Sequence, residues 1–301
     1  MTAATTSARR SAAAPRPLTS HEKEILASLY LHRLLTTNQI HQLHDPTKHV
    51  RATQLRLRRL GERGFVAHAI GAMPGKQFRW FLTALGAEMA ELGGDVEIRK
   101  FRMDLNRATS AHADHLMAAN DLGVALTQAA RRHGDQFDHR RWHHEVAHRY
   151  GRGSSDQLSA DAAVIYDVHS ATGVTSERRF IEVDRGTEPV HRLVDKVYAY
   201  KQYSRWEPPR KDSETHLAKV AWRRIYPTFP GVVFVFVGLG ASQAKARATD
   251  LAHWCAVDTR LNTTQIDVAV TTLDAVQAHG PFAPICQLIP SEQTVPMFRR
   301  R

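Results

Sequence analysis

The chain has 301 residues and a formal charge of +11 at neutral pH, with 43% hydrophobic, 24% charged and 8% aromatic residues. This composition is typical of a globular protein, and the length favours two domains. The longest apolar run, residues 232–237, is far shorter than the roughly 20 residues that a membrane span needs. We therefore expect no membrane segment.

The N-terminal segment and the cysteines bear on the expected location. Residues 1–17 are rich in Ala, Thr, Ser, Arg and Pro and lack the apolar stretch of a signal peptide, which predicts a disordered basic arm. Cys255 and Cys286 lack CxxC spacing, so neither a disulfide scaffold nor a zinc ribbon is expected. These features favour a cytoplasmic protein in a reducing compartment.

The positive charge is concentrated at the start of the chain. Residues 1–107 hold 17 Lys and Arg against 9 Asp and Glu, whereas the remaining residues hold 24 against 21. Lysines and arginines that neutralise phosphates release condensed counterions, which favours binding to nucleic acids. The alternative is a basic, solvated surface without a polyanionic partner.

Three helices followed by two strands are predicted in residues 18–92. Threonines that suit helix N-caps come ahead of the first two periodic apolar segments, and a turn rich in Gly and Pro separates the strands. The expected helices are residues 18–33, 36–45 and 49–63, and the expected strands are residues 65–70 and 77–82. This order predicts a winged helix-turn-helix, whose third helix enters the major groove of DNA.

The third helix carries a polar face beside its apolar stripe. Arg51, Gln54 and Arg58 recur at helical spacing and are expected to read base edges, because Arg and Gln pair with guanine and adenine. The cations expected to contact phosphates are Lys48, Arg56, Arg59, Arg63, Lys76 and Arg79. Double-stranded DNA is the expected partner, although some folds of this kind bind protein instead.

The rest of the chain predicts an α/β domain. A short helix at 83–91 closes the first domain, residues 93–109 are a linker, residues 110–288 form the second domain, and residues 289–301 are a loose basic tail. The expected strands are 142–150, 161–168, 178–184, 232–237 and 265–271, and the expected helices are 110–132, 190–203 and 242–257. A strand meander followed by strands separated by helices predicts a mixed sheet. The expected fold class is α/β, or α+β over the whole chain.

Carboxylates of this domain are candidate metal ligands. Glu182 and Asp184 lie two apart on one expected strand and share a face. Asp161 begins the strand before them, and Glu145 belongs to the strand before that. Such a cluster suits Mg²⁺, which prefers oxygen ligands and helps water attack a phosphodiester. Lys196, on the following helix, is expected to stabilise developing negative charge. The alternative for each acid is an ordinary ion pair or a turn cap.

Some of these segments resemble a known family. The residues concerned are Ser-Ala-Asp-Ala at 159–162, Phe-Ile-Glu-Val-Asp-Arg-Gly-Thr-Glu at 180–188, and Lys196 with Tyr200. They are similar to the replication-relaxation family of plasmids and integrative conjugative elements, over roughly residues 18–284. The resemblance implies a winged helix joined to a restriction-endonuclease-like domain of the PD-(D/E)XK type. It also implies a role in plasmid replication, relaxation or mobilisation.

The sequence departs from the usual nuclease pattern at one position. A lysine normally follows the catalytic carboxylate by two residues, whereas Asp184 stands at that place. Either Lys196 supplies the cation, so that Asp161, Glu182 and Asp184 form an atypical Mg²⁺-dependent nuclease or nickase site, or the site binds DNA without cutting it. Two other functions stay open: a transcriptional regulator whose second domain serves only to form a homodimer or to bind a partner, and a recruiter of a relaxase or replication protein.

Overall fold

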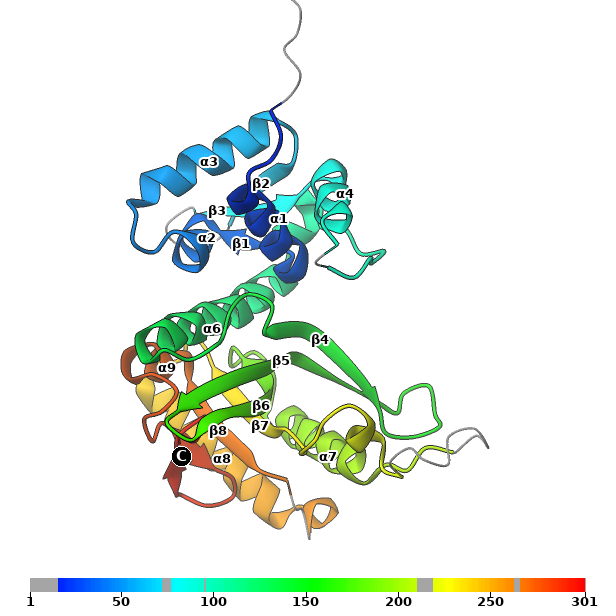
Figure 1. Ribbon diagram of the computed structural model, residues 1–301. Coiled ribbons are helices and arrows are strands. Elements are labelled where there is room, and N and C mark those ends of the chain that lie inside the picture. The colour runs from blue at the N-terminus through cyan, green and yellow to red at the C-terminus, as the bar shows by residue number, and fades with distance from the viewer. Residues whose placement is uncertain (1–15, 72–76, 95, 210–218, 263–265, 301) are drawn as a thin grey trace, which may run out of the picture.

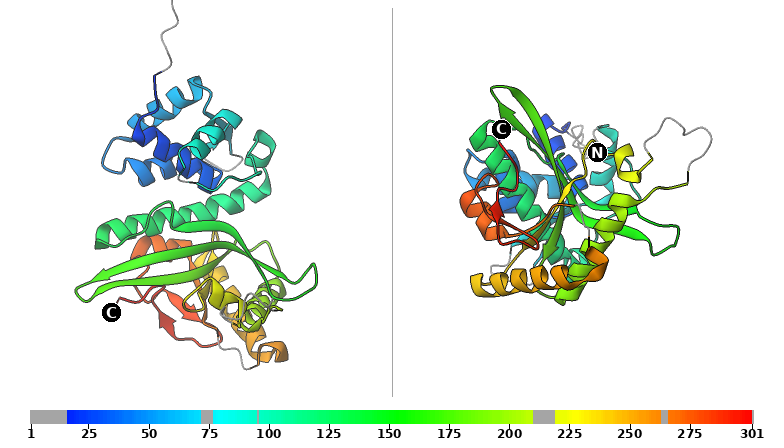
Figure 2. Two further views of the ribbon diagram at one scale, coloured as in Figure 1. Left: turned by 45° about the vertical axis from the view of Figure 1, so that its right-hand side comes forward. Right: turned by 90° about the horizontal axis from the view of Figure 1, so that it is seen from below.

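The computed structural model describes residues 16–71, 77–94, 96–209, 219–262 and 266–300. Figures 1 and 2 show a smaller N-terminal unit and a larger unit built on a mixed sheet, with the long helix α6 (Ala111–His133) running between them. This combination of helices and a mixed sheet is the expected α/β class.

The N-terminal unit combines helices with a small antiparallel sheet ordered β1-β3-β2. Its elements are α1 (Ser20–His32), β1 (Leu35–Thr36), α2 (Thr37–His44), α3 (Val50–Glu62), β2 (Val66–Ile70), β3 (Phe78–Leu82) and α4 (Ala84–Leu92). Capping boxes begin the first two helices: Thr19 pairs with Glu22, and Thr36 pairs with Gln39. The helices and the hairpin expected from the sequence are confirmed, and β1 is an addition.

The N-terminal unit packs directly on α6. The Asn120 side chain donates to the Leu34 carbonyl at 2.7 Å, and Gln39 donates to Asp121 at 2.7 Å. One apolar cluster continues from α1 through α6 to the sheet beneath. The segment expected to be a linker also contains a short helix, α5 (Leu105–Ala108). The two units are therefore joined by a shared core.

The second unit contains, among the described residues, a seven-stranded sheet ordered β10-β9-β8-β7-β6-β5-β4. Its strands are β4 (Trp142–Arg149), β5 (Gln157–Ser170), β6 (Gly173–Asp184), β7 (Gly231–Phe236), β8 (Val268–Thr272), β9 (Cys286–Leu288) and β10 (Thr294–Val295). The helices are α7 (Val190–Arg205), η2 (Ala221–Arg224), α8 (Ala241–Val257), η3 (Thr259–Leu261) and α9 (Leu273–His279). Strands β6, β7 and β8 run parallel, and the other neighbours are antiparallel.

The sheet buries side chains on both faces. The face toward α6 and α9 belongs to the cluster shared with the N-terminal unit, and the opposite face packs against α7 and α8. This burial explains the nearly continuous apolar run of β7. Within the described ranges, no helix has both the length and the apolar character required to span a bilayer.

The C-terminal segment corrects one expectation. The part of residues 289–301 that the structure describes is packed rather than loose: β10 pairs with β9, and the Met297 and Phe298 side chains are buried. Phe298 stacks on Tyr166 with ring centroids 4.6 Å apart. The prediction of a loose tail followed the arginines at the end of the sequence and overlooked the apolar residues beside them.

Candidate functional site

Helix α3 presents the polar face that the sequence predicts. Its buried side is formed by Thr53, Leu57 and Leu60, which hold the helix against the rest of the N-terminal unit. Arg51, Gln54, Arg58 and Arg59 are exposed to solvent. Arg58 pairs with Glu62 at 2.9 Å, but both side chains remain largely exposed. This surface therefore offers cations and an amide to a partner.

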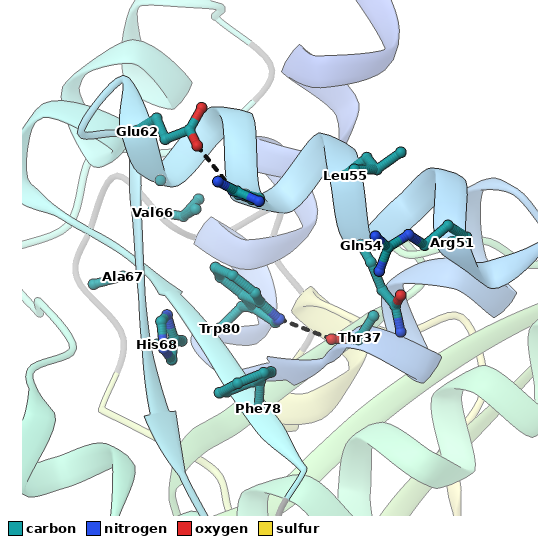
Figure 3. Close-up of a pocket in the computed structure, with 12 residues that line it drawn as sticks. Thr37, Arg51, Gln54, Leu55, Glu62, Val66, Ala67, His68, Phe78 and Trp80 are labelled. Carbon is teal, nitrogen blue, oxygen red and sulfur yellow. Dashed lines mark hydrogen bonds and ion pairs between the residues drawn. The ribbon is translucent and has the colours of Figure 1, made fainter.

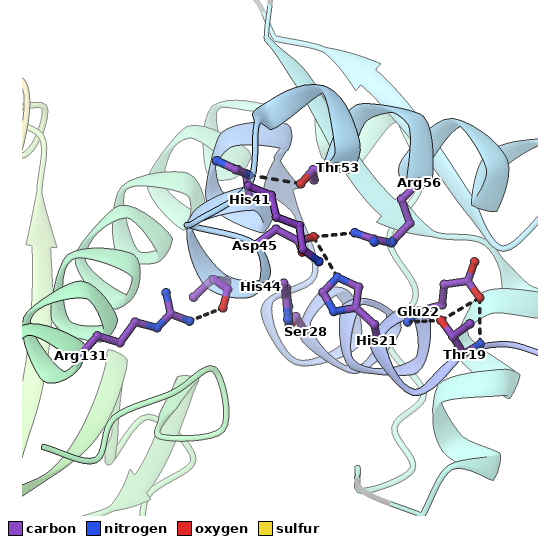
Figure 4. Close-up of polar contacts among 12 residues, drawn as sticks. Thr19, His21, Glu22, Ser28, His41, His44, Asp45, Thr53, Arg56 and Arg131 are labelled. Carbon is purple, nitrogen blue, oxygen red and sulfur yellow. Dashed lines mark hydrogen bonds and ion pairs between the residues drawn. The ribbon is translucent and has the colours of Figure 1, made fainter. Parts of the chain in front are cut away.

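Two of the cations expected to contact phosphate are bound to a carboxylate of the protein. Asp45 follows α2, and its buried side chain accepts from Lys48 at 2.9 Å and from Arg56 at 2.5 Å (Figure 4). Lys48 is 57% exposed, so its ammonium still reaches solvent, whereas Arg56 is 23% exposed. Arg56 is therefore mainly an internal partner of Asp45.

The remaining expected phosphate contacts differ in their surroundings. Arg63 donates to the Arg16 carbonyl at 2.6 Å and lies over the Phe65 ring. Lys76 lies outside the described residues. Arg79 corrects the prediction: its side chain is buried and binds Asp114 on α6 at 2.5 Å and the Ala108 carbonyl. It joins the hairpin to α6 and is not available to a phosphate.

A groove lies between α3 and the β2–β3 hairpin (Figure 3). It has a volume of about 920 Å³ and is lined mainly by apolar and aromatic groups. Arg51 and Gln54 stand along one side, while His68 and Phe78 from the two strands form part of the other. Arg58, also on α3, lines the groove as well. Trp80 closes the groove at depth and donates to Thr37 at 2.9 Å. No sequence pattern indicates this groove, because it depends on the distance between the helix and the hairpin.

The second site comprises Asp161, Glu182 and Lys196. Lys196 reaches Glu182 Oε2 at 3.0 Å, and Tyr200, one turn further along α7, donates to Glu182 Oε1 at 2.6 Å. Asp161 accepts from the Val183 backbone N–H at 2.8 Å, which holds its carboxylate beside β6. Glu182 is fully buried, whereas Asp161 and Lys196 are partly exposed at 20% and 29%. Solvent therefore reaches the cluster from one side.

A strand irregularity brings Asp161 to this position. Ala160 packs with α7, whereas Ala162 packs on the opposite face of the sheet, although residues two apart in a regular strand share a face. The neighbouring strand changes in step, because Glu145 has φ +51° and is skipped in the pairing of β4 with β5. At Glu145 and Asp161 the two strands therefore change the face of the sheet to which their side chains point, while the pairing register stays the same.

The charges of the cluster are strongly coupled. Burial and the Asp161 charge raise the pKa of Glu182 to about 7, against the opposing effects of Lys196 and Tyr200. Burial also raises the pKa of Asp161, but the hydrogen bond and charge of His115 hold it below its usual value. For Lys196, the carboxylate charges outweigh burial and keep the pKa of the amine above its usual value. The site therefore holds a protonated lysine between two acids.

The other two expected metal ligands lie elsewhere. Asp184 is held by the guanidinium of Arg247 on α8, with Nη2 to Oδ1 at 3.0 Å, and also accepts from the Gly186 N–H. Glu145 pairs with Arg33 at 2.7 Å and with His112 at 3.2 Å. Among the described residues, no group of three or more His, Cys, Asp or Glu is placed to hold a metal ion. The prediction that four carboxylates converge is therefore wrong, because Asp184 and Glu145 each pair with a separate arginine.

Sequence reasoning missed two partners of these acids. His115 on α6 contacts Asp161 Oδ1 at 3.0 Å, although the two residues are 46 positions apart in the chain. Arg247 lies 63 positions after Asp184. No local pattern connects such distant residues, and the amphipathic rhythm of α6 and α8 indicates only that these side chains avoid the apolar face.

Asp161 and Glu182 together meet the small number of carboxylate ligands with which proteins bind Mg²⁺. This ion is often bound by one or two carboxylates together with water and substrate phosphates. Asp161 and Glu182 provide two such groups, and Glu182 Oε2 has no hydrogen-bond donor of good geometry besides its ion pair with Lys196. A pre-formed four-carboxylate centre is not present in the described residues, but a two-carboxylate site is compatible with them.

The comparison with protein families gave one match. The family described as replication-relaxation matches residues 26–215, which is more than half of the chain. The match includes α3, the hairpin, and the strands and helix that carry Asp161, Glu182 and Lys196. The comparisons with curated proteins and with solved structures gave no match.

Proposed function

Because the chain belongs to the replication-relaxation family, we propose that it binds double-stranded DNA during replication, relaxation or mobilisation of a plasmid or other mobile element. Membership of the family supports a general role in replication or relaxation. The proposal that the partner is double-stranded DNA rests on the exposed face of α3, where Arg51, Gln54 and Arg58 stand together. We take the N-terminal unit to be a winged helix that inserts α3 into the major groove.

Binding to labelled duplex DNA, followed by fluorescence anisotropy at several salt concentrations, tests this proposal. Arg51→Ala should weaken binding by about tenfold, the effect of losing one good base contact. Arg152→Ala, which removes an equally exposed cation from the β4–β5 turn, is the matched control and should change affinity little. If both variants bind as tightly as the unaltered protein, α3 is not part of the DNA interface.

A second activity is supported by the Asp161–Glu182–Lys196 cluster. We propose that the α/β unit is restriction-endonuclease-like and nicks DNA with Mg²⁺ held by Asp161 and Glu182. The bound ion would supply Lewis-acid stabilisation of the phosphate and a more acidic water. The parallel pairing of β6, β7 and β8 supports the proposed fold. Lys196 on α7, the helix that follows the strand carrying Glu182, is the expected substitute for the lysine that Asp184 replaces.

The residues around the two carboxylates have different roles in the proposed reaction. His115 and the Val183 N–H fix the two oxygens of Asp161, so that its carboxylate keeps one orientation. Tyr200 restrains Glu182 in the same way. Lys196 holds a positive charge within 3.0 Å of Glu182, where it can stabilise charge that develops on a phosphate.

Relaxation of supercoiled plasmid by the purified protein with Mg²⁺ or Mn²⁺ tests this activity. Glu182→Gln should abolish nicking while leaving duplex binding intact, because the change keeps the size of the side chain and lies far from α3. Glu177→Gln alters a partly buried acid on the same strand, which pairs with Arg179, and should keep the activity. Binding without cleavage in the unaltered protein would instead leave a DNA-binding recruiter or regulator.

A further inference from the structure

The groove between α3 and the hairpin has properties that duplex recognition does not use. Phe78 is 45% exposed and His68 is also exposed, and their rings meet edge to face with centroids 4.6 Å apart. His68 also lies 4.9 Å from the Trp80 ring. Bases of an intact duplex are stacked on one another and offer only their edges to a protein. An exposed aromatic floor therefore cannot stack on the base faces of paired DNA.

Strand geometry explains why these rings gather at one place. Phe78 and Trp80 lie two apart on β3 and face the same side of the sheet, and His68 pairs directly with Trp80 across β2 and β3. The apolar side chains of Leu55 and Val66 complete the lining (Figure 3). The floor is thus built from regular elements.

The rim of the groove has the charge of a nucleic-acid site. Arg51 and Arg58 stand at its edge together with one acid, Glu62, which pairs with Arg58 at 2.9 Å. Arg59, also exposed, continues the positive surface of α3 beyond the groove. A second hollow of about 260 Å³ adjoins the groove and shares Thr37, Gln54 and Phe78 with it. Phe78 therefore has space on more than one side, which suits a strand of several nucleotides better than a single small ligand.

We propose that this groove takes unpaired bases of DNA, which stack on Phe78 and His68. In this melted segment Arg51 and Arg58, which face base edges in a duplex, contact the adjoining phosphates instead. The inference rests on the proposed function, since it assumes that α3 faces DNA, and it names the substrate as a duplex with a locally melted or single-stranded segment. Stacking of a base on an aromatic side chain strengthens binding by about tenfold or more, so it gives a clear preference for unpaired DNA.

The test compares full-length protein on two labelled DNAs of identical sequence: a complete duplex, and the same duplex with a short mismatched bubble. The unaltered protein should bind the bubble about tenfold more tightly. Phe78→Ala should remove that preference and leave duplex affinity unchanged, whereas Phe78→Trp should retain it. Leu85→Ala is the matched control, because Leu85 is also 45% exposed but lies on α4, away from the groove.

The outcomes separate this inference from the proposed function. Equal affinity of the unaltered protein for bubble and duplex would overturn the inference, as would a Phe78→Ala variant that weakens both DNAs alike. If Arg51→Ala still weakens duplex binding in either case, the proposed function stands without the single-stranded site. Failure to bind any DNA would overturn both.

Discussion

Asp45 illustrates how one buried carboxylate organises the basic N-terminal unit. Its side chain is 1% exposed and contacts Lys48, Arg56 and His21, which come from three different segments (Figure 4). Burial raises the pKa of Asp45, but these partners outweigh it and lower the pKa to about 2. Because the folded pKa lies below the unfolded one, the ionised group stabilises the fold above about pH 4, and this contribution is lost as the pH falls toward 2.

Asp45→Asn should therefore lower the free energy of unfolding at pH 7 by about 1–3 kcal/mol, the usual effect of losing hydrogen bonds to a charged group. Urea denaturation measures the change. The difference from the unaltered protein should shrink between pH 4 and pH 2, as Asp45 takes up a proton and becomes neutral like the asparagine. Glu62→Gln serves as the control, since the exposed Arg58–Glu62 pair contributes little. A larger loss in Glu62→Gln than in Asp45→Asn would contradict this account.

At the scale of elements, glycines mark where helices approach their neighbours. Gly123 lies in α6, and a Cβ atom there would stand 2.4 Å from the Trp142 ring. That ring cannot easily move, because it is buried and stacks with His32 at 3.9 Å and with Phe137 at 5.7 Å. Gly61, in α3, has ordinary space, with Val66 atoms no closer than 3.7 Å. The same substitution should therefore have opposite effects at the two positions.

Gly61→Ala should stabilise the protein by about 0.5–1 kcal/mol, because alanine has the higher helix propensity. Gly123→Ala has the same gain in propensity, but the clash should reverse it and destabilise the protein by about 1–3 kcal/mol. Thermal unfolding followed by circular dichroism compares the two variants. A stabilising Gly123→Ala would mean that α6 is held less closely to β4 than the structure indicates.

At the scale of the whole molecule, the sequence predicts what is local and misses what depends on distant partners. Threonine caps and the Gly/Pro turn identified the helices and the hairpin correctly, because capping and turn formation involve neighbours in the chain. Arg79 was expected to face DNA, but Asp114, 35 residues later, draws it into the interior. Asp184 was expected beside a metal and instead meets Arg247. Carboxylate spacing fixes a shared face but cannot say which distant cation lies opposite.

The contact between the two units depends on histidines that are neutral when folded. His32 donates to the His139 carbonyl at 2.7 Å, a bond that leaves its other ring nitrogen to accept from His144 at 3.1 Å. His44, at the end of α2, lies beside His139 of the second unit, with ring centroids 5.3 Å apart. Burial, reinforced by neighbouring positive groups, lowers the pKa of His44 and His144 to about 3, that of His139 to about 4, and that of His32 well below its usual value.

Acid should therefore destabilise the protein well above the range in which carboxylates titrate. Below about pH 6.5 the unfolded chain protonates these histidines while the folded chain does not, so stability is lost as the pH falls. Glu182, Asp121 and His115 have the opposite sign, because their raised pKa values let the folded state take up a proton first. Burial also lowers the pKa of His143 and His148, so six histidines act against these three groups.

Urea denaturation at several pH values between about 6 and 4 should show this loss, and His44→Gln should reduce its slope by roughly one proton, or about 1.4 kcal/mol per pH unit. His253→Gln, which removes an exposed histidine from α8, should leave the slope as it is. A stability that is flat or rises toward pH 4 would show that the histidines at this contact take up protons without opening it, and that the shared core alone joins the two units.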